Sequence, residues 1–403
     1  MVRKLILVVA LFFVFSCAAC PGRQSGETQK PAPATPAPPA AAAVKPIRIG
    51  ALLAITGPAS SLGLPEKQTL EMLAEETNAA GGINGRPVEL VIYDTEGDET
   101  KSVTLAKRLI SNDHVTAIIG TSRSGTSMAI LDLVNTAQLP MISLALSYQI
   151  VTDAQGQQRK WVFKAPASDS ASVEKMFDWF NKQGIKKIAL MTVSNGYGDS
   201  GRSELLRLAP NYGIEVVADE RFGDEDVDMT AQLTKIKGTP AQAIVVWATQ
   251  KAPAIIAKNH KTLGMTQLLV QSQGVASKKF IELCGDAADG QVLPGGRLIV
   301  ADQLPDTDPQ KPILLAYKQK FEAKYGPVSV FGGHAWDAFM LLKMAMEKTG
   351  TDDPAKVRDA LEQIQGFVGI DGVFNLSAAD HCGLSRDAFI MLKIENGDWK
   401  IIQ

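Results

Sequence analysis

The clearest chemical motif in this chain is a glycine-rich turn that follows an apolar strand. Residues 196–201 read Gly-Tyr-Gly-Asp-Ser-Gly, and Asp219 follows about 20 residues later, which formally matches a dinucleotide-binding fingerprint. In that fingerprint the glycines bring the backbone close to a pyrophosphate at the start of a helix. Here Ser194 and Asn195 lengthen the turn, so we interpret it as a loop that holds no nucleotide.

Side chains suited to catalysis or metal binding form no other recognisable pattern. Residues 120–124 (Gly-Thr-Ser-Arg-Ser) place serines at a strand end, but they lack the closing glycine of a nucleophile elbow. The four histidines lack the spacing of metal ligands, and we expect each to be a surface or packing residue: His114, His260, His334 and His381. We therefore predict a protein that is not an enzyme and that needs no metal or cofactor.

Composition places the chain among ordinary folded proteins. Of its 403 residues, 45% are hydrophobic and 21% are charged, which excludes a disordered chain or a coiled-coil rod. Lys and Arg together number 41 against 43 Asp and Glu, so no basic excess is available for binding a nucleic acid. The length predicts two domains of about 150 residues and an additional segment.

The additional segment is at the N-terminus and has the features of an export signal. Arg3 and Lys4 precede an apolar run, Leu5–Phe15, that is too short to span a bilayer. Residues 16–20 (Ser-Cys-Ala-Ala-Cys) resemble the lipobox of bacterial lipoproteins. We predict a signal peptide over residues 1–19 and lipidation of Cys20, with Cys17 as the alternative acceptor; a plain signal peptide cleaved after Ala19 is a further alternative.

Residues 20–46 are predicted to be a tether. All but one of residues 31–43 are Pro or Ala, a composition that is stiff, extended and unable to form a core. At ~3.1 Å per residue it would hold a domain roughly 40 Å from a membrane. The layout is that of a globular module anchored outside the cytoplasm.

The rest of the chain alternates between strand and helix patterns. Apolar runs typical of buried parallel strands are interrupted by amphipathic segments, which predicts an α/β fold with two doubly wound parallel-sheet lobes. In the first half the strands are 47–55, 88–93, 115–120 and 140–146, and the helices are 65–79, 102–110 and 126–136. In the second half the strands are 188–193, 214–218, 243–247, 268–271 and a segment from about 290 to 301. Two helices follow, from Ile313 and from His334. The last element is a hairpin, 389–402, that turns at Asn396-Gly397. Ligands of such lobes bind beyond the carboxyl ends of the strands.

Several motifs, in order along the chain, resemble the extracytoplasmic solute-binding proteins of the leucine/isoleucine/valine-binding type. The first two are Ile55-Thr56-Gly57-Pro58 after the opening strand and Asn78-Ala79-Ala80-Gly81-Gly82-Ile83-Asn84-Gly85-Arg86 before a strand that ends in Asp94. Others are Ile119-Gly120, Pro140-Met141-Ile142-Ser143, Tyr197-Gly198, Leu263-Gly264, Ala335-Trp336-Asp337-Ala338 and Asn396-Gly397-Asp398-Trp399. The resemblance implies a type I periplasmic binding protein: an N-terminal lobe (47–165 and 298–386) and a C-terminal lobe (166–297 and 387–403), joined by three crossovers.

The same resemblance implies where a ligand carboxylate binds. Ser124 and Gly125 stand where a strand turns into a helix, and free N–H groups there attract an anion. Ser124 could instead serve as the N-cap of that helix. On the next strand Ala145 would offer its carbonyl and Ser147 its hydroxyl and N–H, whereas Leu146 is larger than the Ala usual in the family.

Further site residues are expected from both lobes. Leu62 occupies a first-loop position that is often aromatic in the family, and Tyr197 matches the aromatic residue that covers the ligand from the second lobe. Thr249 ends a strand at the cleft, and Trp247 on the same strand is either a contact or a core residue.

Position 273 departs from the family pattern and bears on the solute. Amino-acid binders place an acid there to pair the ligand ammonium, but this chain has Gln273, while Arg123 adds a cation beside the carboxylate loop. A buried ammonium without a counter-charge is costly. Together these features suggest a carboxylate solute without an α-amino group, such as an aromatic or short aliphatic acid.

Two cysteines, Cys284 and Cys382, remain in the exported part after lipidation, and we predict that they form a disulfide.

The functional prediction is a lipid-anchored, monomeric binding component of an ABC importer in the periplasm, which captures an amino acid or organic carboxylate and passes it to a permease. The alternative is a sensory receptor domain of the same fold that acts through a partner protein.

Overall fold

The computed structural model describes residues 45–249 and 251–402. The predicted signal peptide, nearly all of the tether and both candidate lipidation sites, Cys17 and Cys20, lie outside these residues. Within the described ranges, no helix has both the length and the apolar character needed to cross a bilayer.

The first lobe is built on a sheet in which all neighbouring strands are parallel, in the order β2-β1-β3-β4-β5. Its strands are β1 (Ile47–Leu53), β2 (Val88–Asp94), β3 (Ala117–Gly120), β4 (Met141–Ser143) and β5 (Val162–Lys164). The helices between them are α1 (Ser60–Ala79), α2 (Glu99–Ser111) and α3 (Ser124–Ala137). Because consecutive parallel strands need a crossover, this β-α alternation follows directly from the sheet.

The second lobe has a larger sheet in the order β14-β13-β10-β9-β8-β6-β7. Its strands are β6 (Lys187–Val193), β7 (Glu215–Phe222), β8 (Ala243–Trp247), β9 (Leu268–Gln271), β10 (Val292–Gly295), β13 (Ile390–Glu395) and β14 (Asp398–Ile402). The helices are α4 (Asp169–Gln183), α5 (Gly196–Leu208), α6 (Thr230–Lys237), α7 (Ala252–Thr262) and α8 (Lys278–Cys284). The predicted C-terminal hairpin is confirmed, and it pairs antiparallel with β10 at the edge of an otherwise parallel sheet.

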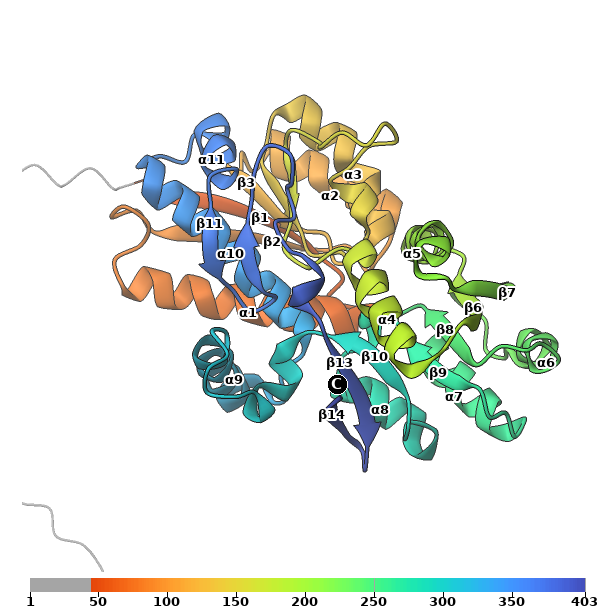
Figure 1. Ribbon diagram of the computed structural model, residues 1–403. Coiled ribbons are helices and arrows are strands. Elements are labelled where there is room, and N and C mark those ends of the chain that lie inside the picture. Colours follow the sequence, from red (N-terminus) through yellow and green to blue (C-terminus); the bar gives the residue numbers. More distant parts are fainter. Residues whose placement is uncertain (1–44, 250, 403) are drawn as a thin grey trace, which may run out of the picture. The chain divides into compact units, whose positions relative to one another are not determined.

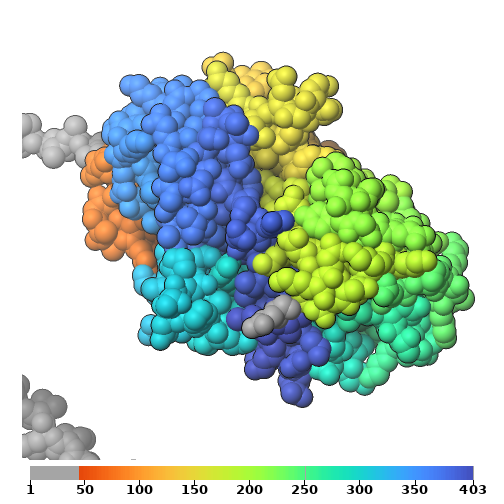
Figure 2. Space-filling view, in the orientation of Figure 1, coloured from red at the N-terminus to blue at the C-terminus, as the bar shows by residue number. Residues whose placement is uncertain are grey.

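The chain passes between the sheets more than once. It leaves the first lobe after β5 and builds the second sheet up to β10. After β10 it returns to the first lobe, where α10 packs on the sheet, and it joins the second sheet again at β13. Figure 2 shows the blue C-terminal quarter of the chain covering the front of the first lobe and continuing into the second. The predicted fold class, two parallel-sheet lobes of the α/β type, is therefore confirmed, whereas the proposed domain boundaries remain a prediction.

The segment between β10 and β13 supplies the remaining elements. They are α9 (Lys311–Tyr325), α10 (Val330–Thr349), α11 (Pro354–Leu361) and the small hairpin of β11 (Gln365–Val368) and β12 (Val373–Asn375). Short 3₁₀ turns occur at η1 (Tyr148–Ile150), η2 (Ala209–Tyr212), η3 (Gln273–Val275), η4 (Gly285–Ala287), η5 (Arg297–Gln303) and η6 (Arg386–Ala388). Helix α10 lies beside α1 against the first sheet (Figure 1).

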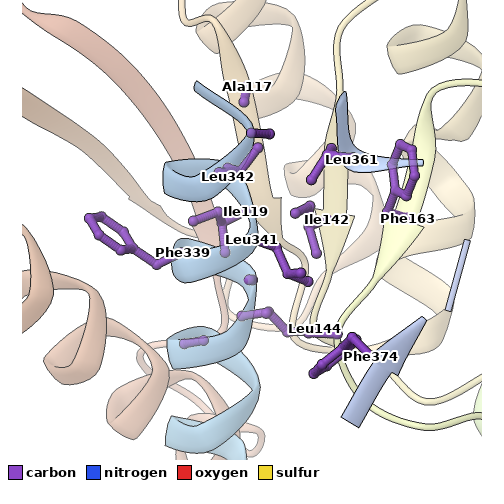
Figure 3. Packing of buried hydrophobic residues seen from close by; sticks show 14 of the residues in the cluster. Ala117, Ile119, Ile142, Leu144, Phe163, Phe339, Leu341, Leu342, Leu361 and Phe374 are labelled. Atoms are coloured by element: carbon purple, nitrogen blue, oxygen red, sulfur yellow. The ribbon is translucent and has the colours of Figure 1, made fainter. Parts of the chain in front are cut away.

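The core of the first lobe shows why α10 belongs there. Leu341 and Leu342 of α10 are fully buried and lie in one apolar cluster with Ile119 of β3 and Ile142 of β4 (Figure 3). Burying aliphatic side chains of this size contributes about 1.5–3 kcal/mol each. The late segment of the chain thus completes the core of the first sheet.

Some predicted elements differ from the structure. The predicted strand 140–146 ends at Ser143, and the segment predicted as a strand up to Ala301 stops at Gly295 and continues as the 3₁₀ turn η5. Apolar residues continue past both strand ends because these segments are buried as loops and turns. Helix α1 begins at Ser60 rather than at Pro65.

Candidate functional site

A cavity lies where the carboxyl ends of β3 and β4 meet the start of α5. Six predicted ligand residues line it: Leu62, Arg123, Ser124, Ala145, Tyr197 and Thr249. Two do not, namely Ser147 and Gln273. Residues from both lobes therefore enclose one space, as expected for strands of doubly wound sheets that end at the same edge.

Helix α3 begins at this cavity with Ser124 as its first residue. The interpretation of Ser124 as the N-cap is wrong: Arg123 holds that position, and no side chain caps the helix. The Ser124 hydroxyl instead accepts a 3.3 Å hydrogen bond from the Ser147 N–H. The first N–H groups of the helix are left open, and together with the helix dipole they favour an anion.

A buried lysine fixes the backbone of the segment that follows β4. Lys164 of β5 is fully buried, and its Nζ donates to the Leu146 carbonyl at 2.6 Å and to the Ser168 hydroxyl at 3.3 Å. Burial lowers the pKa of Lys164, while nearby carboxylates oppose that shift. The Ala145 carbonyl accepts no hydrogen bond from the described residues, and Ala145 lines the cavity, so its role as a ligand acceptor stays a prediction.

Ser147 lies behind the cavity and contacts the second lobe. Its side chain is completely buried, and its hydroxyl donates to the Ser200 hydroxyl of α5 at 2.7 Å. Ser200 in turn donates to the Asp169 carboxylate. In this arrangement the Ser147 side chain joins the lobes rather than lining the cavity.

The Asn195 side chain caps the N-terminus of α5, where a dinucleotide-binding loop would hold a pyrophosphate. The Asn195 side chain accepts from the N–H groups of Tyr197 and Gly198 at 3.0 and 3.1 Å. A pyrophosphate would need these same donors. A side chain at Gly198 would overlap the Val193 carbonyl, and one at Gly201 would overlap the Trp247 indole. The glycines are therefore explained by close packing.

The same packing assigns Trp247 to the core. Its side chain is fully buried in an apolar cluster and does not line the cavity. The Tyr197 ring lies between Trp247, at a centroid distance of 5.8 Å, and the cavity. The Tyr197 hydroxyl is buried next to Ser272 and Gly274 without a well-formed hydrogen bond among the described residues, and burial raises its pKa.

Arg123 connects the lobes at the edge of the cavity. Its guanidinium lies 2.7 Å from the Asp224 carboxylate, which also accepts from the Asn195 amide at 2.7 Å. A second guanidinium nitrogen donates to the Gly97 carbonyl at 3.2 Å. A ligand carboxylate would have to compete with Asp224 for this side chain.

Gln273 lines a different cavity, on the far side of Leu146. Its Oε1 accepts from the Ser172 hydroxyl at 2.5 Å, and its Nε2 is buried without a partner in the described chain. Position 273, expected to face the ammonium end of a ligand, therefore does not line the candidate ligand cavity.

Sequence reasoning missed several residues at the site. Phe331, at the start of α10, lines the cavity together with Ser122, whose hydroxyl donates to buried Glu66. Burial raises the pKa of Glu66 well above its usual range, and the Ser122 hydrogen bond opposes that shift. Phe331 is far from the site in sequence, and no local pattern marks it.

The predicted disulfide is wrong. Cys284 and Cys382 are both free and buried. Cys284 packs in the core of the second lobe, whereas Cys382 packs in the core of the first. Burial raises the pKa of Cys284 to about 11 and also raises that of Cys382, so both thiols are poorly reactive.

Comparisons with known proteins agree with this geometry. The leucine-, isoleucine-, valine-, threonine- and alanine-binding protein of Pseudomonas aeruginosa is 25% identical over 81% of this chain and 86% of its own length. Leu/Ile/Val-binding protein homolog 3 of Brucella melitensis is 25% identical over 89% of this chain and 94% of its own. An extracellular ligand-binding receptor from Rhodopseudomonas palustris HaA2 superposes with a TM-score of 0.82 at 26% identity, covering 89% of this chain and 99% of that one.

A more distant structure supports the fold alone. The branched-chain amino acid substrate-binding protein LivJ of Streptococcus pneumoniae, solved with isoleucine, has a TM-score of 0.77 at 24% identity and covers 89% of this chain and 99% of its own. The family model described as periplasmic binding protein matches residues 46–398. The chain therefore belongs to the periplasmic binding protein family.

Proposed function

We propose that this protein is the lipid-anchored binding component of an ABC importer and captures a small carboxylate solute between its lobes. The single observation that carries the proposal is the shared cavity of Ser124, Ala145 and Tyr197, which combines an open helix N-terminus, a free carbonyl and an aromatic cover. The names of the relatives, which bind leucine and similar amino acids, support a solute of this size.

The carboxylate would bind the N–H groups at the start of α3 and the Ser124 hydroxyl. Leu62, Leu146 and Phe331 would contact the apolar part of the solute. The cavity volume is only about 30 Å³. Because a water needs about 10–15 Å³ by the same measure, a solute must open the lobes or displace side chains to enter.

Among the described residues no acidic side chain lines this cavity, so a solute ammonium would lack a counter-charge from them. Carboxylates without an α-amino group are therefore candidates beside the branched-chain amino acids.

The test is a thermal-shift screen of the full-length chain against both classes, followed by calorimetry of each hit. A ligand at a hundredfold excess over its dissociation constant stabilises the native state by about 2.7 kcal/mol. Uptake of the hit by cells with and without the protein separates the importer from a sensory receptor. A screen in which neither class shifts the melting temperature would reject the proposal.

A further inference from the structure

A second cavity lies directly behind Leu146. Gln273, His334 and Asp371 line it, with Val330 and Phe389 among the apolar walls. Leu146 lines both this cavity and the candidate ligand site, so its side chain lies between the two spaces. The second cavity has a volume of about 20 Å³, and three polar side chains, Gln273, His334 and Asp371, interrupt its mainly apolar lining.

One unsatisfied hydrogen-bond donor lies at this cavity. The Gln273 side chain is 4% exposed, and its Oε1 is already bonded to the Ser172 hydroxyl at 2.5 Å. Its Nε2 has no partner among the described residues. Leaving a buried donor unpaired costs about 1–3 kcal/mol, so such a group calls for a ligand or water partner.

One unsatisfied acceptor lies at the same cavity. His334 Nδ1 is 2.7 Å from Asp371 Oδ2, and Nε2 has no partner in the described chain. Burial lowers the pKa of His334 to about 3, so the ring is neutral. If Nδ1 carries the proton and donates to Asp371, Nε2 is left as an acceptor.

The surrounding charges favour that arrangement. Burial raises the pKa of both Asp337 and Asp371, and the Asp371 charge raises that of Asp337 further. The hydrogen bond with Asp337 and the Lys164 charge oppose the shift at Asp371. Both Asp337 oxygens already accept backbone N–H groups, from Ile370 and Asp371, whereas Asp371 Oδ2 faces the imidazole.

We propose that this second cavity receives a hydroxyl group of the bound solute, which accepts a hydrogen bond from Gln273 Nε2 and donates one to His334 Nε2. A hydroxyl matches one free donor and one free acceptor, which neither an ammonium nor a carboxylate does. The inference rests on the proposed function, in which the carboxylate of the same solute binds at α3. The solute class is then a hydroxy acid whose hydroxyl lies far from its carboxylate, and Leu146 must turn aside to admit it.

The test is calorimetry of the full-length chain with straight-chain ω-hydroxy acids of increasing length, each paired with the acid of equal length that lacks the hydroxyl. Beyond the length that passes Leu146, the hydroxy acid should bind about tenfold more tightly than its partner. Gln273→Met should abolish that preference. Leu146→Ala should strengthen binding of the longer acids.

The matched control is Gln271→Met. Gln271 is also a buried amide on the same segment, but it bonds Gln291 at 2.7 Å and does not line the cavity, so its variant should keep the preference. Equal affinities for both acids of every pair would overturn the inference and leave the proposed function intact. If no acid binds at all, the proposed function itself fails. If Gln273→Met does not fold, His334→Asn tests the acceptor in the same way.

Discussion

The Ser147 hydroxyl donates a 2.7 Å hydrogen bond to the Ser200 hydroxyl, which joins the loop after β4 to helix α5 of the other lobe. The Ser200 hydroxyl in turn donates a hydrogen bond to the Asp169 carboxylate, and the Ser147 N–H donates one to the Ser124 hydroxyl. The candidate ligand site is thus connected by hydrogen bonds to a contact that exists only while the lobes are together. Binding and closure should be coupled through it.

Ser200→Ala should weaken ligand binding about three- to tenfold, because it removes the inter-lobe bond of Ser147. The loss should appear mainly as a faster dissociation rate, since the bond forms on closure. Stopped-flow kinetics and calorimetry measure both quantities. Ser203→Ala, on the exposed side of the same helix, is the control and should bind normally. Unchanged dissociation in the Ser200 variant would contradict the coupling.

Asp169 should make stability depend on pH. Burial raises its pKa from 3.8 to about 6. Between these values the native state holds the proton more tightly than the unfolded chain, so this contribution is present at low pH and is lost as pH rises to about 6. The unfolding free energy of the wild type minus that of Asp169→Asn should fall by up to roughly 3 kcal/mol from about pH 4 to 7. Urea titrations across this range test it, and a constant difference would refute the raised pKa.

Ser124→Ala should lower carboxylate affinity about ten- to a hundredfold, because a hydrogen bond to a charged group contributes roughly 1.5–3 kcal/mol. Unliganded stability should change much less, since Ser124 provides only one long bond to Ser147. Calorimetry measures the affinity, and Ser111→Ala at the exposed end of α2 serves as control. Full affinity in the Ser124 variant would place the carboxylate elsewhere.

Tyr197→Phe should change stability and binding in opposite directions. The hydroxyl is buried without a partner in the described chain, so its removal should leave the unliganded protein equally or more stable. If the hydroxyl bonds the solute, affinity should fall by about tenfold. Thermal unfolding without ligand and calorimetry with ligand give the two values. Loss of stability in the variant would indicate a structural bond instead.

Gly201→Ala should destabilise the protein by about 1–3 kcal/mol or more, because the added methyl group would overlap the buried Trp247 indole. Gly238→Ala is the matched control: its φ is −79° and its Cβ would meet only the Lys235 carbonyl, at 3.6 Å. That change should be neutral or slightly stabilising. Chemical denaturation of both variants compares them, and equal stability would remove the packing explanation of the glycine motif.

Strand and helix order was predictable because buried parallel strands carry dense apolar runs. The β8 and β9 bounds, Ala243–Trp247 and Leu268–Gln271, agree with the predicted ranges. The runs at 140–146 and 290–301 were misleading, because a loop buried against a core is as apolar as a strand.

The candidate site was predictable where it depends on strand ends and helix starts, as at Ser124, Ala145 and Tyr197. It was not predictable where it depends on side chains brought together by the crossovers. Lys164 is the last residue of an apolar strand, and the sequence around it gives no sign of its hydrogen bond to the Leu146 carbonyl. The pairing of His334 with Asp371 joins residues separated by helix α11 and strand β11, and the separate burial of Cys284 and Cys382 is likewise a property of the fold.

The position of the C-terminal hairpin has a consequence for biosynthesis. Strands β13 and β14 cover the edge of β10, and Trp399 of β14 is buried in the core of the second lobe. As the chain emerges N-terminus first, β6 to β10 must wait for residues 390–402 before their sheet is complete. Until then β10 presents an open edge of unpaired backbone groups, which is a site for misassembly. The newly made chain is therefore vulnerable to aggregation or proteolysis until residues 390–402 have joined the sheet.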